Sequence, residues 1–288
     1  MVHVPLAAEP VLSIGSFAIT NALINALLVS VILMIGAVFL NSRLKEIPGR
    51  FQNAVEMVFE FLLEFFDKVT KDRKRSLQCF PLVATFFIFI LLSNWFGLLP
   101  GTGSIGIWHV LDGEREFLPL LRPANSDLNL TIAMSLVSVL GSHLLGMITI
   151  GFWTHANKFI QLGSFWKAVK TLNPIKIFVA IIEFLVGLIE IVGEIAKVAS
   201  LSLRLFGNIF AGEVLITVIG SLMAFVAPLP FMGIELLVGL VQASVFSVLT
   251  LVYMNLMMTA PHGSHDDHPP AAKKNKNTNV STTVAASH

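Results

Sequence analysis

The fold of this chain is decided by residues 175–226, which read IKIFVAIIEFLVGLIEIVGEIAKVASLSLRLFGNIFAGEVLITVIGSLMAFV. Splitting this apolar run into two upright membrane spans would need a turn near residues 197–203, but no Gly, Pro, Asn or Asp is present there. Fifty helical residues extend roughly 75 Å, whereas the hydrocarbon core of a bilayer is roughly 30 Å thick. In a membrane protein this run therefore predicts one long, steeply inclined helix.

The composition of the whole chain is that of a membrane protein. Of the 288 residues, 55% are hydrophobic and only 13% are charged, against about 25% charged in soluble domains. The apolar residues fall in blocks of roughly twenty or more, as membrane spans require. The single cysteine, Cys79, excludes an internal disulfide. The first dozen residues lack the basic region of a secretory signal peptide. We also expect no nucleic-acid partner.

The order of apolar and polar segments predicts an all-α polytopic membrane protein with about five membrane helices. We expect an outer N-terminal segment over 1–13, a single membrane domain over 14–260 and a disordered cytoplasmic tail over 261–288. The expected spans cover roughly residues 14–40, 80–99, 127–152, 175–226 and 233–258.

Two features connect these spans. Residues 41–78 place phenylalanines and valines at helical spacing with acids between them, which is typical of an amphipathic helix on a membrane surface. Pro228 and Pro230 are expected to turn the chain after the long helix, so that the last helix packs antiparallel to it.

The distribution of Lys and Arg predicts the topology. Residues 41–78 carry eight of them, 153–176 carry four and the tail carries three, whereas the loop 100–126 carries two. The positive-inside rule places the first three segments in the cytoplasm. The N-terminus is then expected on the periplasmic side and the C-terminus in the cytoplasm of a bacterial inner membrane.

A line of charges runs along the long helix. Glu183, Glu190, Lys197 and Arg204 are seven residues apart, a spacing that drifts only about 20° per step around a helix. Arginine keeps its charge even when buried, at a cost of roughly 2.5 to 3.5 kcal/mol on membrane-insertion scales. We therefore expect Arg204 to be required by function.

Other polar residues extend this pattern. Asn208 continues the face of Arg204, while Glu213, nine residues past it, points to roughly the opposite side and lies roughly 13 Å further along the axis. Glu235 and Gln242 form a second polar line on the last helix. The arrangement favours two water-accessible half-paths from opposite membrane faces, kept apart by a fixed cation.

Plainer interpretations remain open for several residues. Ser and Thr in membrane helices often bond only to their own backbone or to a neighbouring helix. That interpretation applies to the third-span stripe of Asp127, Thr131, Ser135, Ser138 and Ser142. Asn94 and Gln242 could serve interhelical packing, and a single charge could form an ion pair between helices. Ionisable groups inside a membrane nevertheless favour an ion or proton path.

Residues 202–213, SLRLFGNIFAGE, closely resemble the signature of subunit a of F-type ATP synthases. The resemblance runs from about residue 14 to 258. It includes 93–100 (SNWFGLLP), 173–175 (NPI), and Gln242-Ala243 followed by 249–253 (LTLVY).

The resemblance implies a stator that faces a rotating ring of subunit c, with a peripheral stalk of subunit b, other synthase subunits, the lipid bilayer and protons as partners. It implies that Arg204 is the essential arginine. Asn94, Glu213, Glu235 and Gln242 match the outer half-channel or the arginine-facing contact, Ser126 and Asp127 match its mouth, and Glu190 and Lys197 match the cytoplasmic half-channel. No ATP chemistry and no cofactor or metal are expected on this chain.

The chain departs from the family pattern at two places. It carries glutamate at both 213 and 235, where some members pair a glutamate with a histidine, and Gly97 replaces an often acidic residue. His143 matches no family role, and we expect it to be a packing or interfacial residue.

Three rival functions make different demands on the sequence. A self-contained secondary transporter should show internal repeats with broken helices, and none is found in the sequence. A membrane-embedded enzyme needs a nucleophile with its base or a metal cluster, and the expected spans hold no His or Cys group of that kind. A structural anchor does not need the charged line, so the line argues against that function.

Overall fold

The computed structural model describes residues 10–14, 17–99, 106–111, 114–119, 121–153, 155, 174–223 and 227–259. The expected tail over 261–288 and most of the expected outer segment lie outside the described residues.

The described chain is almost entirely helical, so the prediction of an all-α polytopic membrane protein is confirmed. Four of the helices, α1, α3, α4 and α8, are long and apolar enough to cross a membrane. The helices are α1 (Asn21–Ser42), α2 (Arg50–Thr70), α3 (Arg73–Gly97), the 3₁₀ turn η2 (Ala124–Ser126), α4 (Leu128–Ile150), α7 (Pro174–Leu222) and α8 (Pro228–Met257).

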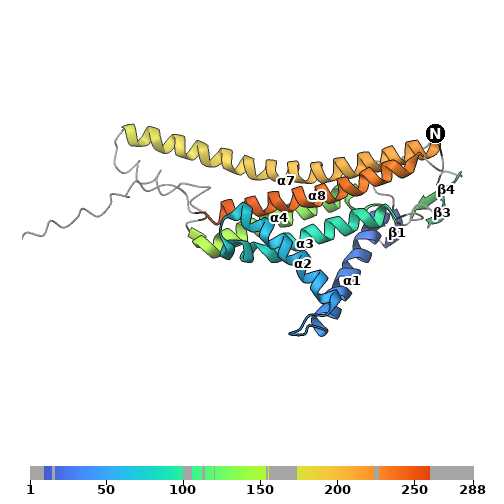
Figure 1. The fold of residues 1–288 in the computed structure, drawn as a ribbon. Coiled ribbons are helices and arrows are strands. Elements are labelled where there is room, and N and C mark those ends of the chain that lie inside the picture. The colour runs from blue at the N-terminus through green and yellow to red at the C-terminus, as the bar shows by residue number, and fades with distance from the viewer. Residues whose placement is uncertain are drawn as a thin grey trace, which may run out of the picture.

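The longest helix is α7, with 49 residues in one continuous element. Figure 1 shows α7 running along one side of the molecule with α8 returning beside it in the opposite direction. Leu201, Leu205 and Ile209 of α7 are buried in a core cluster with Phe246 of α8 and Ile90 of α3. The expected antiparallel hairpin is therefore confirmed.

The start of the first span differs from the sequence-based boundary at residue 14. Strands β1 (Pro10–Ile14) and β2 (Phe17–Thr20) pair as an antiparallel hairpin, and α1 begins only at Asn21. Thr20 caps the helix, because its side chain accepts a hydrogen bond from the backbone N–H of Leu23. An oxygen that satisfies this free N–H fixes the start of the helix. A second hairpin joins β3 (Gly106–Leu111) to β4 (Glu114–Pro119).

The prolines after the long helix also behave differently from the expectation. Pro228 and Pro230 lie in the first turn of α8 and do not precede the helix. Proline is tolerated there because the first N–H groups of a helix have no partner within the helix. These residues therefore start α8, and the last helix is longer at its N-terminus than residues 233–258.

The amphipathic segment forms α2. Helix α1 runs away from the helical bundle, and α2 runs back to it (Figure 1). Leu62 and Phe66 are buried, and the ring of Phe66 lies 5.8 Å from that of Phe80 on α3. Phe51 and Phe61 point outward and are exposed. The two-faced character is thus present, while the position of α2 on a membrane surface stays a prediction.

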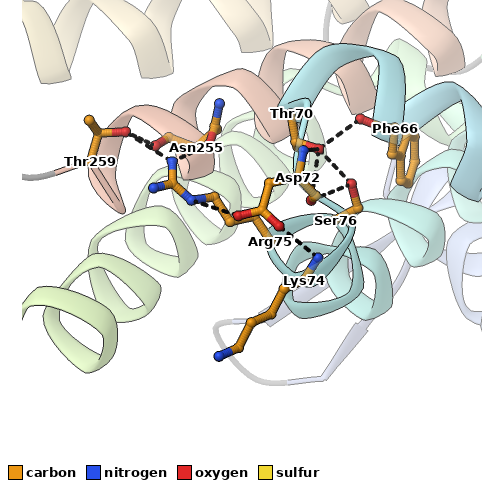
Figure 2. Close-up of polar contacts among 8 residues, drawn as sticks. All are labelled: Phe66, Thr70, Asp72, Lys74, Arg75, Ser76, Asn255 and Thr259. Atoms are coloured by element: carbon orange, nitrogen blue, oxygen red, sulfur yellow. Dashed lines mark hydrogen bonds and ion pairs between the residues drawn. The ribbon is translucent and has the colours of Figure 1, made fainter. Parts of the chain in front are cut away.

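A polar cluster joins α2, α3 and the end of α8 (Figure 2). The hydroxyls of Thr70 and Ser76 lie 2.5 Å apart. Arg75 donates to the Asn255 Oδ1 at 3.2 Å and to the Thr259 Oγ1 at 3.4 Å. One guanidinium on α3 therefore holds the last turn of α8 in place.

We predict that Arg75→Ala lowers the stability of the purified protein by about 1 kcal/mol, as expected for partly exposed charge-assisted hydrogen bonds. Hydrogen exchange should rise first at residues 255–259, because the end of α8 loses its anchor. Lys74→Ala is the matched control, since it removes a neighbouring cation whose side chain points away from the cluster (Figure 2). Equal effects of the two variants in thermal unfolding and hydrogen exchange would contradict this role of Arg75.

Candidate functional site

A cavity of about 370 Å³ lies between α3, α7, α8 and the segment that leads into η2. It brings together two of the acids expected from the sequence, Glu213 and Glu235, although they lie on different helices. Asn94 of α3 lies beside them. The lining residues are Asn94, Gly97, Leu98, Leu99, Pro119, Leu121, Arg122, Pro123, Ile209, Glu213, Ile216, Thr217, Leu229, Met232 and Glu235.

Arg122 is the site residue that the sequence reasoning missed. Its Nε lies 2.7 Å from the Glu213 Oε1, and its side chain is only 4% exposed. Asn25 of α1 donates a 2.8 Å hydrogen bond to the Arg122 carbonyl, which fixes the backbone. The two ion-pair partners are 91 residues apart in sequence. In the sequence, Arg122 is only one of the two basic residues of the loop 100–126. No nearby motif or helical spacing connects it to Glu213.

Glu235 enters the cavity because α7 has a glycine opposite it. An ideal Cβ built on Gly212 would lie 2.0 Å from the Glu235 Oε2, so any side chain there would collide with the carboxylate. Glu235 is 7% exposed, and within the described part of the chain its Oε1 has no hydrogen-bond partner. A buried carboxylate oxygen without a partner is costly. The cavity therefore suits water or a proton at this oxygen.

Asn94 links three parts of the cavity wall. It is buried and approaches the Gly239 carbonyl of α8 with its Nδ2 at 3.5 Å, while the Asn125 Nδ2 donates to its Oδ1 at 2.7 Å. Asn94 therefore serves interhelical packing and lines the cavity at the same time. Gly97 packs against Pro123, where a Cβ would be 2.6 Å from the proline Cγ, so this position has no room for an acidic side chain.

Ser126 and Asp127 are buried near the cavity but are not among the described residues that line it. The Asp127 carboxylate accepts from the Asn129 N–H at 2.9 Å and caps α4. The Ser126 hydroxyl donates to the Pro123 carbonyl at 2.8 Å. Their expected role at the mouth stays a prediction.

The hydroxyls of the third-span stripe follow the plainer interpretation. Thr131, Ser135 and Ser142 each donate to a carbonyl of their own helix. The Ser138 hydroxyl lies 2.8 Å from that of Thr250 on α8. Of these printed hydroxyl contacts, the one between Ser138 and Thr250 joins α4 to α8, and the others stay within α4.

Arg204 lies outside this cavity, on an open face of α7. Ser200, Arg204 and Asn208 are all exposed and lie four residues apart, so they share one face. The Arg204 Nη2 lies 3.4 Å from the Ser200 Oγ. Among the described residues, no carboxylate lies within ion-pair distance of Arg204. Gln242 is buried on α8, seven residues after Glu235.

The residues expected on the other side of Arg204 are half-buried on α7. Glu190 and Lys197 both precede Arg204 along α7. The Lys197 Nζ lies 2.6 Å from the Glu194 Oε1, and it is 5.3 Å from the ring centroid of Tyr253 on α8. Among the described residues, no group of three or more His, Cys, Asp or Glu is placed to hold a metal ion.

We predict that Gly212→Ala folds but pushes the Glu235 side chain out of its position, because the flexible carboxylate yields more easily than the two helices. The extent to which a carboxyl-reactive reagent labels Glu235, measured by mass spectrometry, should differ from that in the unchanged protein. The temperature of thermal unfolding should stay nearly the same. Gly207→Ala on the same helix is the control, since a Cβ there meets nothing within 4 Å. Unchanged Glu235 labelling in Gly212→Ala would contradict this packing.

Comparisons with known proteins agree with the resemblance seen in the sequence. Residues 23–255 match the family model described as ATP synthase A chain. "ATP synthase subunit a" of Gloeobacter violaceus is 32% identical over 83% of this chain and 83% of its own length. The protein of the same name from Trichlorobacter lovleyi is 31% identical over 86% of this chain and 91% of its own length. With the family model covering most of the membrane helices, the chain belongs to the ATP synthase A chain family.

Proposed function

We propose that this chain is the stator of an ATP synthase membrane sector that holds two offset proton half-paths on either side of Arg204. The observation that carries the proposal is the placement of Arg204. It is a permanent cation on an open helix face, with no carboxylate beside it in the described chain. Such a charge in a membrane calls for an acidic partner on another subunit.

The proposed partner is a ring of subunit c that carries one carboxylate per subunit and turns past the Ser200–Arg204–Asn208 face. The guanidinium attracts each passing carboxylate in its ionised form and repels free cations. A proton therefore crosses only when the ring carries it. Gln242, on the adjoining helix, is proposed to contact the same region.

The cavity around Glu213 and Glu235 is the proposed outer half-path. It offers two acids, one paired with Arg122 and one with an oxygen that has no partner among the described groups. Protons can bind transiently at such groups. Asn94 lies in its wall. Ser126 and Asp127 are proposed to form its mouth.

The half-path on the other side is proposed to pass Glu190 and Lys197. Both lie on α7 between its N-terminal end and Arg204. The positive-inside rule puts that end in the cytoplasm of a bacterial inner membrane, with the N-terminus of the chain outside and the C-terminus inside. Subunit b and the other synthase subunits are the proposed fixed partners.

The energy per proton explains why a rotating partner is required. One charge that crosses 100 mV releases roughly 2.3 kcal/mol, which is much less than ATP synthesis needs. Several protons must therefore be used for each ATP, and a ring that returns to its starting position after each passage can add them together. This chain carries no ATP chemistry in the proposal.

We predict that Arg204→Ala abolishes ATP-driven proton pumping and ATP synthesis in vesicles that contain the whole complex, because the ring carboxylate loses its ionising partner. Assembly and membrane insertion should remain normal in immunoblots. Arg43→Ala, which removes an exposed cation at the end of α1, is the control. ATP synthesis at the normal rate in Arg204→Ala would overturn the proposed function, including its preference over a self-contained secondary transporter.

A second prediction concerns the outer half-path. Glu213→Gln should slow proton flux through the complex by roughly 100-fold, the lower end of the effect of removing an acid–base group. Arg122→Gln should also slow flux, because it leaves the Glu213 carboxylate buried without its cation. Ser221→Ala is the control on the same helix, since its hydroxyl bonds only to the Val218 carbonyl in the described contacts. Passive flux at the normal rate in Glu213→Gln would remove this residue from the path.

A further inference from the structure

Four titratable side chains meet where α4 packs against α7, away from the cavity of Glu213 and Glu235. His143 of α4 places its Nε2 3.4 Å from the Glu194 Oε2. Its other ring nitrogen, Nδ1, lies 3.1 Å from the Nε2 of His155, just beyond α4. Glu194 in turn accepts from Lys197 through its second oxygen at 2.6 Å. The four groups form one continuous line.

The backbone is shaped to bring His155 into this line. Gly151 ends α4 with a φ of +93°, a conformation that favours glycine. The His155 N–H then donates to the Gly151 carbonyl at 3.0 Å, and the histidine folds back over α4. A Cβ on Gly146 would lie 2.9 Å from the His155 Cε1, so a glycine is needed here as well. His155 is only 5% exposed.

The position along α7 places this line between the proposed inner face and the arginine. Glu194 precedes Arg204 by ten residues, or roughly 15 Å along a helix. Lys197 is already among the residues proposed for the inner half-path. Glu194, His143 and His155 are not, and the proposed ring contact does not use them.

Imidazole is suited to carry protons through such a line. Histidine is the side chain that ordinarily titrates between pH 5 and 8, and its two nitrogens are separate proton sites. His143 has one nitrogen facing an imidazole and the other facing a carboxylate. A proton bound at Nδ1 is therefore matched by release of a different proton from Nε2.

We propose that His155, His143 and Glu194 form a proton relay of the inner half-path, with the proton or hydronium ion as its ligand. This inference rests on the proposed function. During pumping, a proton from the cytoplasmic water passes through His155 to the Nδ1 of His143, and the imidazolium gives its Nε2 proton to Glu194. One proton enters and one leaves, and the imidazole ends as the opposite tautomer. Exchange with water or a ring flip then resets it.

Lys197 completes the relay by keeping Glu194 from holding a proton for long. Its ammonium lies against Glu194 and favours the ionised carboxylate, so a proton received from His143 is released again. The titratable groups that face His143 in the described chain are Glu194 and Lys197 of α7 and His155. From α8, Tyr253 reaches Lys197.

A metal site and a purely structural clamp would each give a different result from a relay. A metal site is not favoured, because the described residues hold no group of three ligands placed for a metal ion. A clamp between α4 and α7 predicts that variants lose assembled complex or stability, with no change in the pH profile of the complex that remains.

The test uses inverted vesicles with the whole complex, in which the medium replaces the cytoplasm. ATP-driven pumping is measured across roughly pH 5 to 8, the range of histidine titration. Pumping is normalised to assembled complex and to the activity of detached catalytic heads at each pH. The variants are His143→Gln, Glu194→Gln and Glu194→Asp. Thr149→Val is the matched control, since this exposed hydroxyl of α4 bonds to its own Leu145 carbonyl.

We expect His143→Gln and Glu194→Gln to lower normalised pumping by roughly 100-fold and to flatten its pH profile. Glu194→Asp should recover part of the rate, because it restores a titratable carboxylate. A wild-type rate and profile in His143→Gln overturns the relay, and so does an unchanged profile with reduced assembly. Arg204→Ala, measured in the same vesicles, separates the two proposals: if it alone stops pumping, only the relay fails, and if it still pumps, the proposed function fails.

Discussion

The permanent charge of Arg204 is the constraint around which the rest of this structure is arranged. Two acids of α7 form ion pairs with cations of the same chain, Glu213 with Arg122 and Glu194 with Lys197. Arg204 lies between these two pairs, roughly 13 to 15 Å from each acid along the helix. Its face is left open, with only a serine hydroxyl nearby among the described contacts. This uncovered charge between two neutralised ones is the feature on which the proposed contact with a ring of subunit c rests.

The scaffold that holds this arrangement depends on close helix contacts at small residues. Gly212 lets α8 place Glu235 against α7, and Gly239 lets Asn94 approach α8. Small residues allow such approach in membranes, where lipid is as apolar as a leucine side chain and packing must supply the association energy. Around these contacts, Phe86 and Phe246 meet with ring centroids 5.2 Å apart and fill the core. Rigid packing therefore keeps the acids at fixed positions while the face of Arg204 remains free.

The polar groups of the bundle divide into two kinds with different physical roles. Hydroxyls such as Ser135 and Ser142 satisfy themselves on their own helix, and Asp127 caps α4. In these contacts the groups stabilise the ends and turns of their own helix. Glu235, by contrast, keeps a buried oxygen without a partner among the described groups, and His143 uses both ring nitrogens in a line of titratable neighbours. Groups of this second kind are the ones proposed above to bind and release protons.

Much of the fold followed from the sequence alone, because helices in a membrane must satisfy their backbone within each segment. Residues 175–226 lacked any turn signal, and α7 is indeed one helix from Pro174 to Leu222. The opposite placement of Arg204 and Glu213 followed from helical periodicity. The sequence also indicated the family, since residues 202–213 are specific. Element starts were less certain, since the cap at Thr20 and the prolines inside α8 depend on local hydrogen bonding.

What only the tertiary structure decided is which distant residues meet. Arg122 and Glu213 are 91 residues apart, and no helical period links a loop arginine to an acid on another element. No sequence pattern linked His143 to Glu194 or His155, and these neighbours follow from the packing of α4 on α7 and from the turn at Gly151. Periodicity determines which way a side chain points from its own helix. The identity of its neighbour depends on how helices pack, which is a property of the whole bundle.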